Sequence, residues 1–140
     1  TQSRAAKEEV SLSFSPNSGN WKVGQNKSLG IILSTGTKVI SGVDLTVKYD
    51  PALVNIEQNS VAAGKLLENV LVRKIIPGKI SFSAVTLSPA AKNGLLLTLT
   101  FMPIKKGQLN LTFESPSDVM ESPSALNVLN KKTSAQFDIQ

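Results

Sequence analysis

Residues 43–49 follow a strict two-residue period, and this period constrains the fold more than any other feature of the chain. The apolar and polar side chains alternate without a break: Val43, Leu45, Val47 and Tyr49 against Asp44, Thr46 and Lys48. Because successive side chains of a strand point to opposite faces, the segment is predicted to be a half-buried strand. Asp50-Pro51 ends it, since proline has no amide hydrogen for a sheet ladder.

Short strands and turn signals continue along the rest of the chain. Their spacing of about 8–12 residues predicts roughly nine strands, as in a sandwich of two sheets. We therefore predict an all-β, nine-stranded antiparallel sandwich with jelly-roll topology, whose N- and C-terminal strands are adjacent and whose chain ends lie close together. Residues 88–94 are the one place where a helical turn is expected. Leu97, Leu99 and Phe101 alternate with threonines on the most apolar strand and are predicted to be buried between the sheets.

Length and composition favour one domain. The chain has 140 residues, of which 41% are hydrophobic, enough for one packed core. Residues 1–9 are polar and aperiodic and are interpreted as a linker or an expression remnant, and residues 10–140 as the domain. No apolar run reaches the roughly 18 residues that a membrane span needs. A monomeric module within a larger scaffold is the expected context.

The residue types that are missing limit the possible chemistry. The chain has no His and no Cys, so the commonest general base and all thiolate chemistry are absent. Its ten acidic residues are dispersed, with no pair in a catalytic context. We therefore predict that the chain is not an enzyme. The net charge of +5 comes from scattered basic pairs, which are interpreted as solvated turns and protected sheet edges and not as a nucleic-acid surface.

Four segments, in order, resemble the cohesin family. Residues 15–24 resemble its entry segment, with Gln25 where Asp is more usual, and residues 42–51 resemble its Gly-Val-Asp…Tyr-Asp-Pro strand. Residues 77–82 resemble a family hairpin, and residues 94–101 resemble its Gly-x-Leu-x-x-Leu-x-Phe strand. The resemblance extends over nearly the whole domain. It implies a jelly-roll module that binds a dockerin, a partner module of another protein.

The resemblance also implies which residues bind. In cohesins one exposed sheet face carries the dockerin, and an aspartate on it accepts hydrogen bonds from dockerin hydroxyls; Asp44 takes that place. The residues expected on this face are Asp44, Thr46, Lys48, Arg73, Lys79, Ser81, Ser83, Asn110 and Thr112, with Gln108 at its margin. No cofactor is expected on this chain, because the calcium belongs to the dockerin. The expected location is extracellular or at the cell surface of a bacterium or archaeon.

Two other functions stay open at this point. A carbohydrate-binding module would present coplanar aromatic rings, but Trp21 is expected to pack over the sandwich end and Tyr49 to point into the core. A bound calcium would need several oxygen ligands, of which Asp118, Glu121 and Asn127 can supply some. The other alternative is a structural or adhesin domain of a surface protein, whose exposed sheet binds nothing specific.

Overall fold

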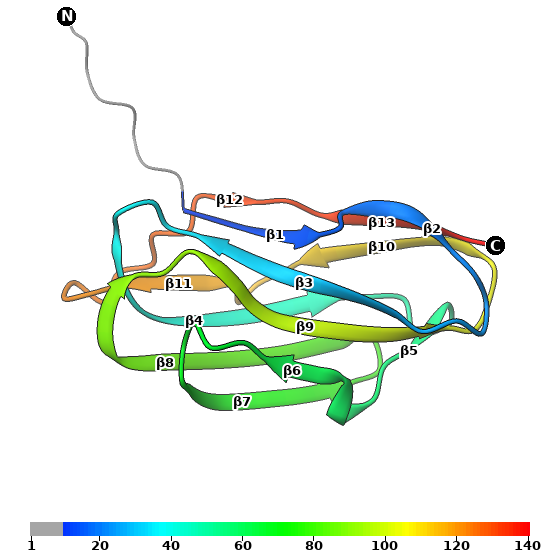
Figure 1. Ribbon diagram of the computed structural model, residues 1–140, viewed down its shortest axis with the longest axis horizontal. Helices are drawn as coiled ribbons and strands as arrows, with labels where there is room; N and C mark the ends of the chain where they lie inside the picture. Colours follow the sequence, from blue (N-terminus) through cyan, green and yellow to red (C-terminus); the bar gives the residue numbers. More distant parts are fainter. Residues whose placement is uncertain (1–9) are drawn as a thin grey trace, which may run out of the picture.

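Residues 10–140 are described by the computed structural model, and they form two packed sheets (Figure 1). The first sheet has the order β12-β1-β3-β9-β5, and β6 also pairs with β9. Its strands are β1 (Ser11–Ser15), β3 (Lys27–Ser34), β5 (Val54–Asn55), β6 (Val61–Ala63), β9 (Gly94–Pro103) and β12 (Lys131–Lys132). The linker expected at 1–9 lies outside the described residues.

The second sheet has the order β2-β13-β10-β4-β8-β7, and β11 also pairs with β4. Its strands are β2 (Ser18–Trp21), β4 (Val39–Lys48), β7 (Asn69–Ile76), β8 (Lys79–Ala91), β10 (Gly107–Phe113), β11 (Asp118–Glu121) and β13 (Ala135–Ile139). Within the described residues 10–140, the only helix is the 3₁₀ turn η1 (Gln58–Ser60). None of the helices described is long and apolar enough to cross a membrane.

The core lies between the two sheets and follows the period seen in the sequence. Leu97, Leu99 and Phe101 on β9 are buried as predicted. The Trp21 ring stacks on Phe137, with 4.1 Å between the ring centroids, and the Tyr49 ring lies 5.9 Å from that of Phe101. Both Trp21 and Tyr49 are therefore core residues, as expected, and neither offers an open platform for a sugar.

The first and last strands are adjacent, as predicted, but they pair in parallel. β1 pairs with β12, and β2 pairs with β13, both in parallel register, so the expectation of an entirely antiparallel sandwich is wrong at these two places. The expectation that the chain ends lie close together is also wrong. Parallel neighbours run in the same direction, so Val10 and Gln140 lie at opposite ends of the sandwich's long axis (Figure 1).

The described residues form thirteen strands instead of about nine. The difference arises from short edge strands and from one interruption. β10 pairs with β4 as far as Phe113, and β11 pairs with β4 from Asp118 onward. Both strands thus lie along the same edge of β4, where one strand was expected. The segment between β10 and β13 thus contains the two short strands β11 and β12.

The helical turn expected at 88–94 is not formed, because β8 continues to Ala91. The side chain of Asn93 then fastens the chain to the facing turn. Its Oδ1 accepts hydrogen bonds from the backbone N–H of Thr35 at 2.7 Å and of Gly36 at 3.1 Å. These bonds tie the segment after β8 to the turn between β3 and β4.

Candidate functional site

The outward face of β10, β4, β8 and β7 is the candidate site, and the strand register determines which side chains share it. At one end of the face Thr112 pairs with Lys48, Lys48 with Lys79, and Lys79 with Ile76. Directly opposed residues of neighbouring strands point to the same side of a sheet. We call this end of the face the lysine end, and Lys74 on β7 belongs to it because it lies opposite Ser81 in the next row.

A row of carboxylates and hydroxyls crosses the centre of the face. Asp118 pairs with Asp44, Asp44 with Ser83, and Ser83 with Val72. Ser83 Oγ donates a hydrogen bond to Asp44 Oδ1. A carboxylate accepts several hydrogen bonds, so this contact leaves Asp44 with capacity for donors from a partner.

Thr46 does not lie on the open face, and the prediction that it does is wrong. It is 6% exposed because the 114–117 segment, which links β10 to β11, passes over it. Its Oγ1 donates to the carbonyl of Pro116 at 2.8 Å, and its N–H donates to Ser117 Oγ at 3.2 Å. Its carbonyl accepts from the N–H of Glu114 at 2.9 Å. Thr46 is thus a structural residue that holds the covering segment.

Arg73 also departs from its predicted place. It pairs with Phe82, whose ring is in the core, so its side chain leaves β7 toward the inner side. Its Nη1 donates to the carbonyl of Val61 on β6 at 3.2 Å, which ties the edges of the two sheets together. Lys74, the next residue, occupies the outward position expected of Arg73.

The predicted residues of β8 and β10 do share the outward face. Lys79, Ser81 and Ser83 alternate with buried Ile80 and Phe82. Lys79 Nζ lies 3.1 Å from the Glu114 carboxylate, in a partly exposed ion pair.

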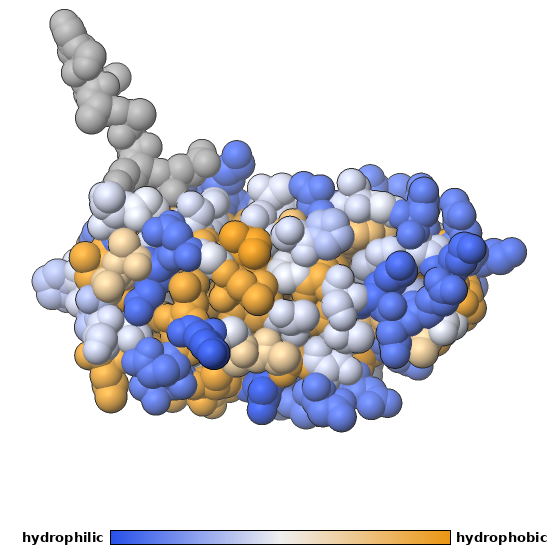
Figure 2. All heavy atoms as spheres, viewed as in Figure 1, coloured by the Kyte–Doolittle hydropathy of each residue, from blue (hydrophilic) through white to orange (hydrophobic). Residues whose placement is uncertain are grey.

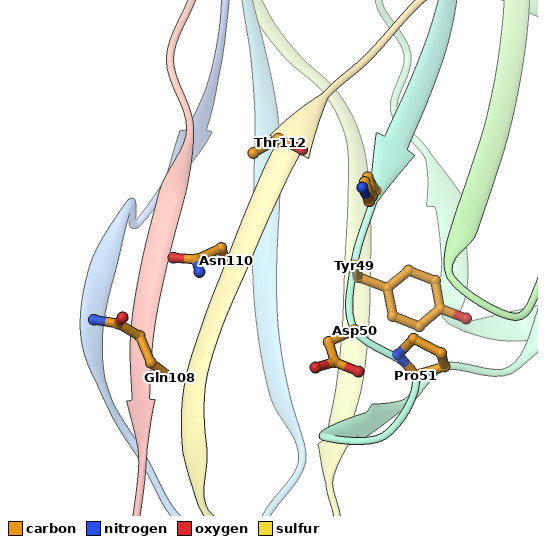
Figure 3. Close-up of a pocket in the computed structure, with 7 residues that line it drawn as sticks. Tyr49, Asp50, Pro51, Gln108, Asn110 and Thr112 are labelled. Carbon is orange, nitrogen blue, oxygen red and sulfur yellow. The ribbon is translucent and has the colours of Figure 1, made fainter.

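Asn110, Thr112 and Gln108 line a groove between β10 and the turn after β4 (Figure 3). The groove has a volume of about 460 Å³, and its other wall is formed by residues 48–51. Amide, hydroxyl and carboxylate groups therefore border the open face on the β10 side.

Sequence reasoning missed the apolar side chains of this face. Leu71 is 64% exposed and Leu87 is 85% exposed, and Val72 and Ile76 are also exposed on β7. A register shift between Val70 and Val72 breaks the two-residue period of β7, so alternation could not show which side chains point outward. The run of apolar residues at 70–72 was the available signal, because an ordinary edge strand would alternate.

Glu68 holds the chain beside Leu87 in position. Its Oε1 accepts hydrogen bonds from Thr86 Oγ1 at 2.7 Å and from the N–H of Leu87 at 2.9 Å. The bonds from the Thr86 hydroxyl, the Leu87 amide and the Glu68 amide favour the charged form, so they lower the pKa of Glu68 below its ordinary value of 4.5.

This lowered pKa gives a prediction about pH. A folded-state pKa below the unfolded one contributes stability above the unfolded pKa, and that contribution is lost as the pH falls through the folded pKa. The Leu87 amide signal, followed by NMR, is expected to titrate with a midpoint below 4.5. Thr86→Val removes the hydroxyl while keeping the side-chain shape, and should move the midpoint upward. A midpoint that is the same in both proteins would contradict the assigned cause.

The residues considered for calcium are held by other contacts. Asn127 Nδ2 donates to Asp118 Oδ1 at 2.9 Å, and the carboxylate of Glu121 lies 3.7 Å from Lys38 Nζ. Within residues 10–140, no three His, Cys, Asp or Glu side chains are grouped so as to hold a metal ion.

The two packed sheets define a class of fold, the jelly-roll sandwich. A family model for the cohesin domain matches residues 10–139, so the chain belongs to the cohesin family. No match is found among curated proteins.

Solved structures of cohesins are similar in fold. A cohesin from Clostridium acetobutylicum has a TM-score of 0.78 at 17% identity, over 95% of this chain and 92% of that one. The sixth cohesin of scaffoldin B from Acetivibrio cellulolyticus, solved in complex with a mutant dockerin, has a TM-score of 0.76 at 18% identity, over 94% of this chain and 99% of that one. A non-cellulosomal cohesin from the archaeon Archaeoglobus fulgidus has a TM-score of 0.75 at 18% identity, over 96% and 92%.

Proposed function

We propose that this domain is a non-catalytic interaction module that binds a dockerin through the outward face of β10, β4, β8 and β7. The cohesin family match over residues 10–139 is the observation that carries the proposal. Cohesins of the same fold have been solved together with dockerins, which supports it further. The four strands present a shared outward face whose exposed side chains are available to a partner.

The proposed contact set differs from the predicted one by two omissions and one addition. It keeps the outward residues Asp44, Lys48, Lys79, Ser81, Ser83, Asn110 and Thr112. It omits Thr46, which the 114–117 segment covers, and Arg73, which reaches β6. We place Lys74 in the set because it takes the outward position on β7.

The context follows from the same proposal. We infer that the domain catalyses no reaction and assembles an extracellular or cell-surface complex of a bacterium or archaeon. The domain then acts as a monomeric module of a larger scaffold. Calcium is required by the dockerin and not by this chain.

Asp44→Ala is expected to weaken the complex by about 1–3 kcal/mol, because it removes a charged acceptor and leaves dockerin donors buried without a partner. The measurement is calorimetry with calcium-loaded dockerins encoded by the organism that supplies this chain. The melting temperature should barely change, since Asp44 is on the outward side of β4.

Asp138→Ala is the matched control, because Asp138 is exposed on β13 of the same sheet and lies outside the four strands of the site. It should leave the affinity unchanged. If no calcium-loaded dockerin binds the unsubstituted domain, the proposed function is wrong. If binding is as sensitive to Asp138→Ala as to Asp44→Ala, the site is misplaced.

A further inference from the structure

The end of the face opposite the lysines is formed by a break in the pairing of β8. Val85 faces Gly42 on β4 and Ala90 faces Ile40, so residues 86–89 bulge out of the ladder. At this place β8 turns across the end of the sandwich toward β9 (Figure 1). The bulge is therefore a corner of the sandwich at the margin of the candidate site.

Leu87 projects from this corner into solvent. It follows Val85 at the spacing of outward residues, while Thr86 between them is buried. The Glu68 carboxylate binds the Thr86 hydroxyl and the Leu87 amide, and Thr86 Oγ1 accepts from the N–H of Ser88 at 3.0 Å. A large apolar side chain that is 85% exposed is thus held on a hydrogen-bonded backbone.

Other apolar side chains surround this corner. The bulge of β7 leaves Val72 opposite Ser83 and Leu71 beside it as the extra, exposed residue without a register partner, and Met120 on β11 lies opposite Gly42 in the next row. Gly42 has no side chain, and a Cβ there would lie 3.0 Å from both the Ala84 carbonyl and the Val85 side chain. Gly42 therefore leaves room for the Val85 side chain between the polar central row and the corner. We call Val85, Leu87 and Met120, together with Leu71 and Val72 at the adjoining bulge of β7, the apolar end of the face.

The lysine end is unlike the apolar end in charge. Lys79 is paired with Glu114, but within residues 10–140 neither Lys48 nor Lys74 forms an ion pair. These two cations point to the same side of the sheet as the apolar end. The face therefore presents exposed apolar side chains at the apolar end and, at the lysine end, two lysines without an ion-pair partner among the described residues.

We infer that the face is matched to a helix of the dockerin whose apolar side chains lie at one end and whose carboxylates lie at the other. This inference rests on the proposed function. Leu71 and Leu87 anchor the apolar end, where exclusion of water yields most of the binding free energy. Lys48 and Lys74 attract the acidic end, which speeds association and fixes the direction in which the helix lies.

The test measures association and dissociation rates of Leu71→Ser and Leu87→Ser with the calcium-loaded dockerin that binds the unsubstituted domain. Each variant should bind roughly tenfold more weakly or worse, mainly through faster dissociation. Both side chains are exposed, so the melting temperatures should be unchanged. Leu95→Ser is the control, because Leu95 is an exposed leucine of β9 in the other sheet, where apolar side chains also gather (Figure 2). It should bind normally.

The lysine end is tested with the double variant Lys48→Glu, Lys74→Glu. It should slow association and flatten its dependence on salt, with a smaller change in dissociation. If binding withstands both leucine variants but is weakened by Asp44→Ala, the inference is overturned and the proposed function stands. If Leu87→Ser breaks a dimer seen by sedimentation and leaves dockerin binding intact, a second copy occupies the apolar end and the inference is also overturned. If no dockerin binds the unsubstituted domain, the proposed function itself fails.

Discussion

Leu99→Ala is expected to lower the free energy of unfolding by about 2–5 kcal/mol, the range for deleting a buried leucine side chain. Leu99 is fully buried on β9, where its neighbours in register are Leu29 on β3 and Val61 on β6. Strands on both sides hold the site, so the surrounding chain should relax only partly into the cavity that the substitution leaves. Urea unfolding followed by circular dichroism measures the loss.

Leu87→Ala is the matched control for this prediction. It removes the same atoms from a side chain that is 85% exposed, and should change stability by no more than about 0.5 kcal/mol. A loss below about 1 kcal/mol for Leu99→Ala would mean that the side chain does not lie between the sheets, given the usual cost of such a deletion.

Phe137→Ala is expected to cost about 3–5 kcal/mol, the range for deleting a buried aromatic ring. Phe137 is on the C-terminal strand β13, is buried, and stacks on Trp21 with an angle of 20° between the ring planes. Its ring also lies 3.7 Å from the position that a Cβ of Gly19 would take, so β2 packs directly against it. The substitution should therefore loosen both β2 and β13.

Hydrogen exchange separates this effect from a general loss of stability. In Phe137→Ala the amides of β2 and β13 should lose more protection than those of β4, because they lie beside the cavity. Asp138→Ala, one position along β13 and exposed, should alter neither stability nor exchange. Equal loss of protection in all strands would show that the ring does not hold β2 and β13 in particular.

The sequence correctly predicts which side of a strand is buried where the two-residue period is unbroken. On β4 the alternation of Val43 to Tyr49 correctly indicates the buried side, and on β9 it correctly indicates Leu97, Leu99 and Phe101. In both strands burial repeats with the geometry of the backbone, so residue type is a sufficient guide to facing.

The wrong predictions concern residues whose exposure on the outward face is not determined by alternation alone. Thr46 has the right parity for the open face, but a segment about seventy positions later in the chain covers it. Arg73 and Leu71 lie next to a bulge, which shifts the parity of β7 by one residue. Whether a side chain is outward depends there on long-range contacts and on register, neither of which is local to the sequence.

The parallel pairing of β2 with β13 also has a mechanical consequence. Tension applied between Val10 and Gln140 pulls two parallel neighbours in opposite directions along their length, so the ladder between them is loaded in shear. The bonds from the Val23 amide to the Gln140 carbonyl, at 3.1 Å, and from the Gln140 amide to the Trp21 carbonyl, at 2.8 Å, extend that ladder to the last residue. Under shear these bonds carry the force together and must break together, whereas a strand peeled from its end loses one bond at a time. We therefore expect the arrangement of the terminal strands to make the domain resist stretching along its long axis.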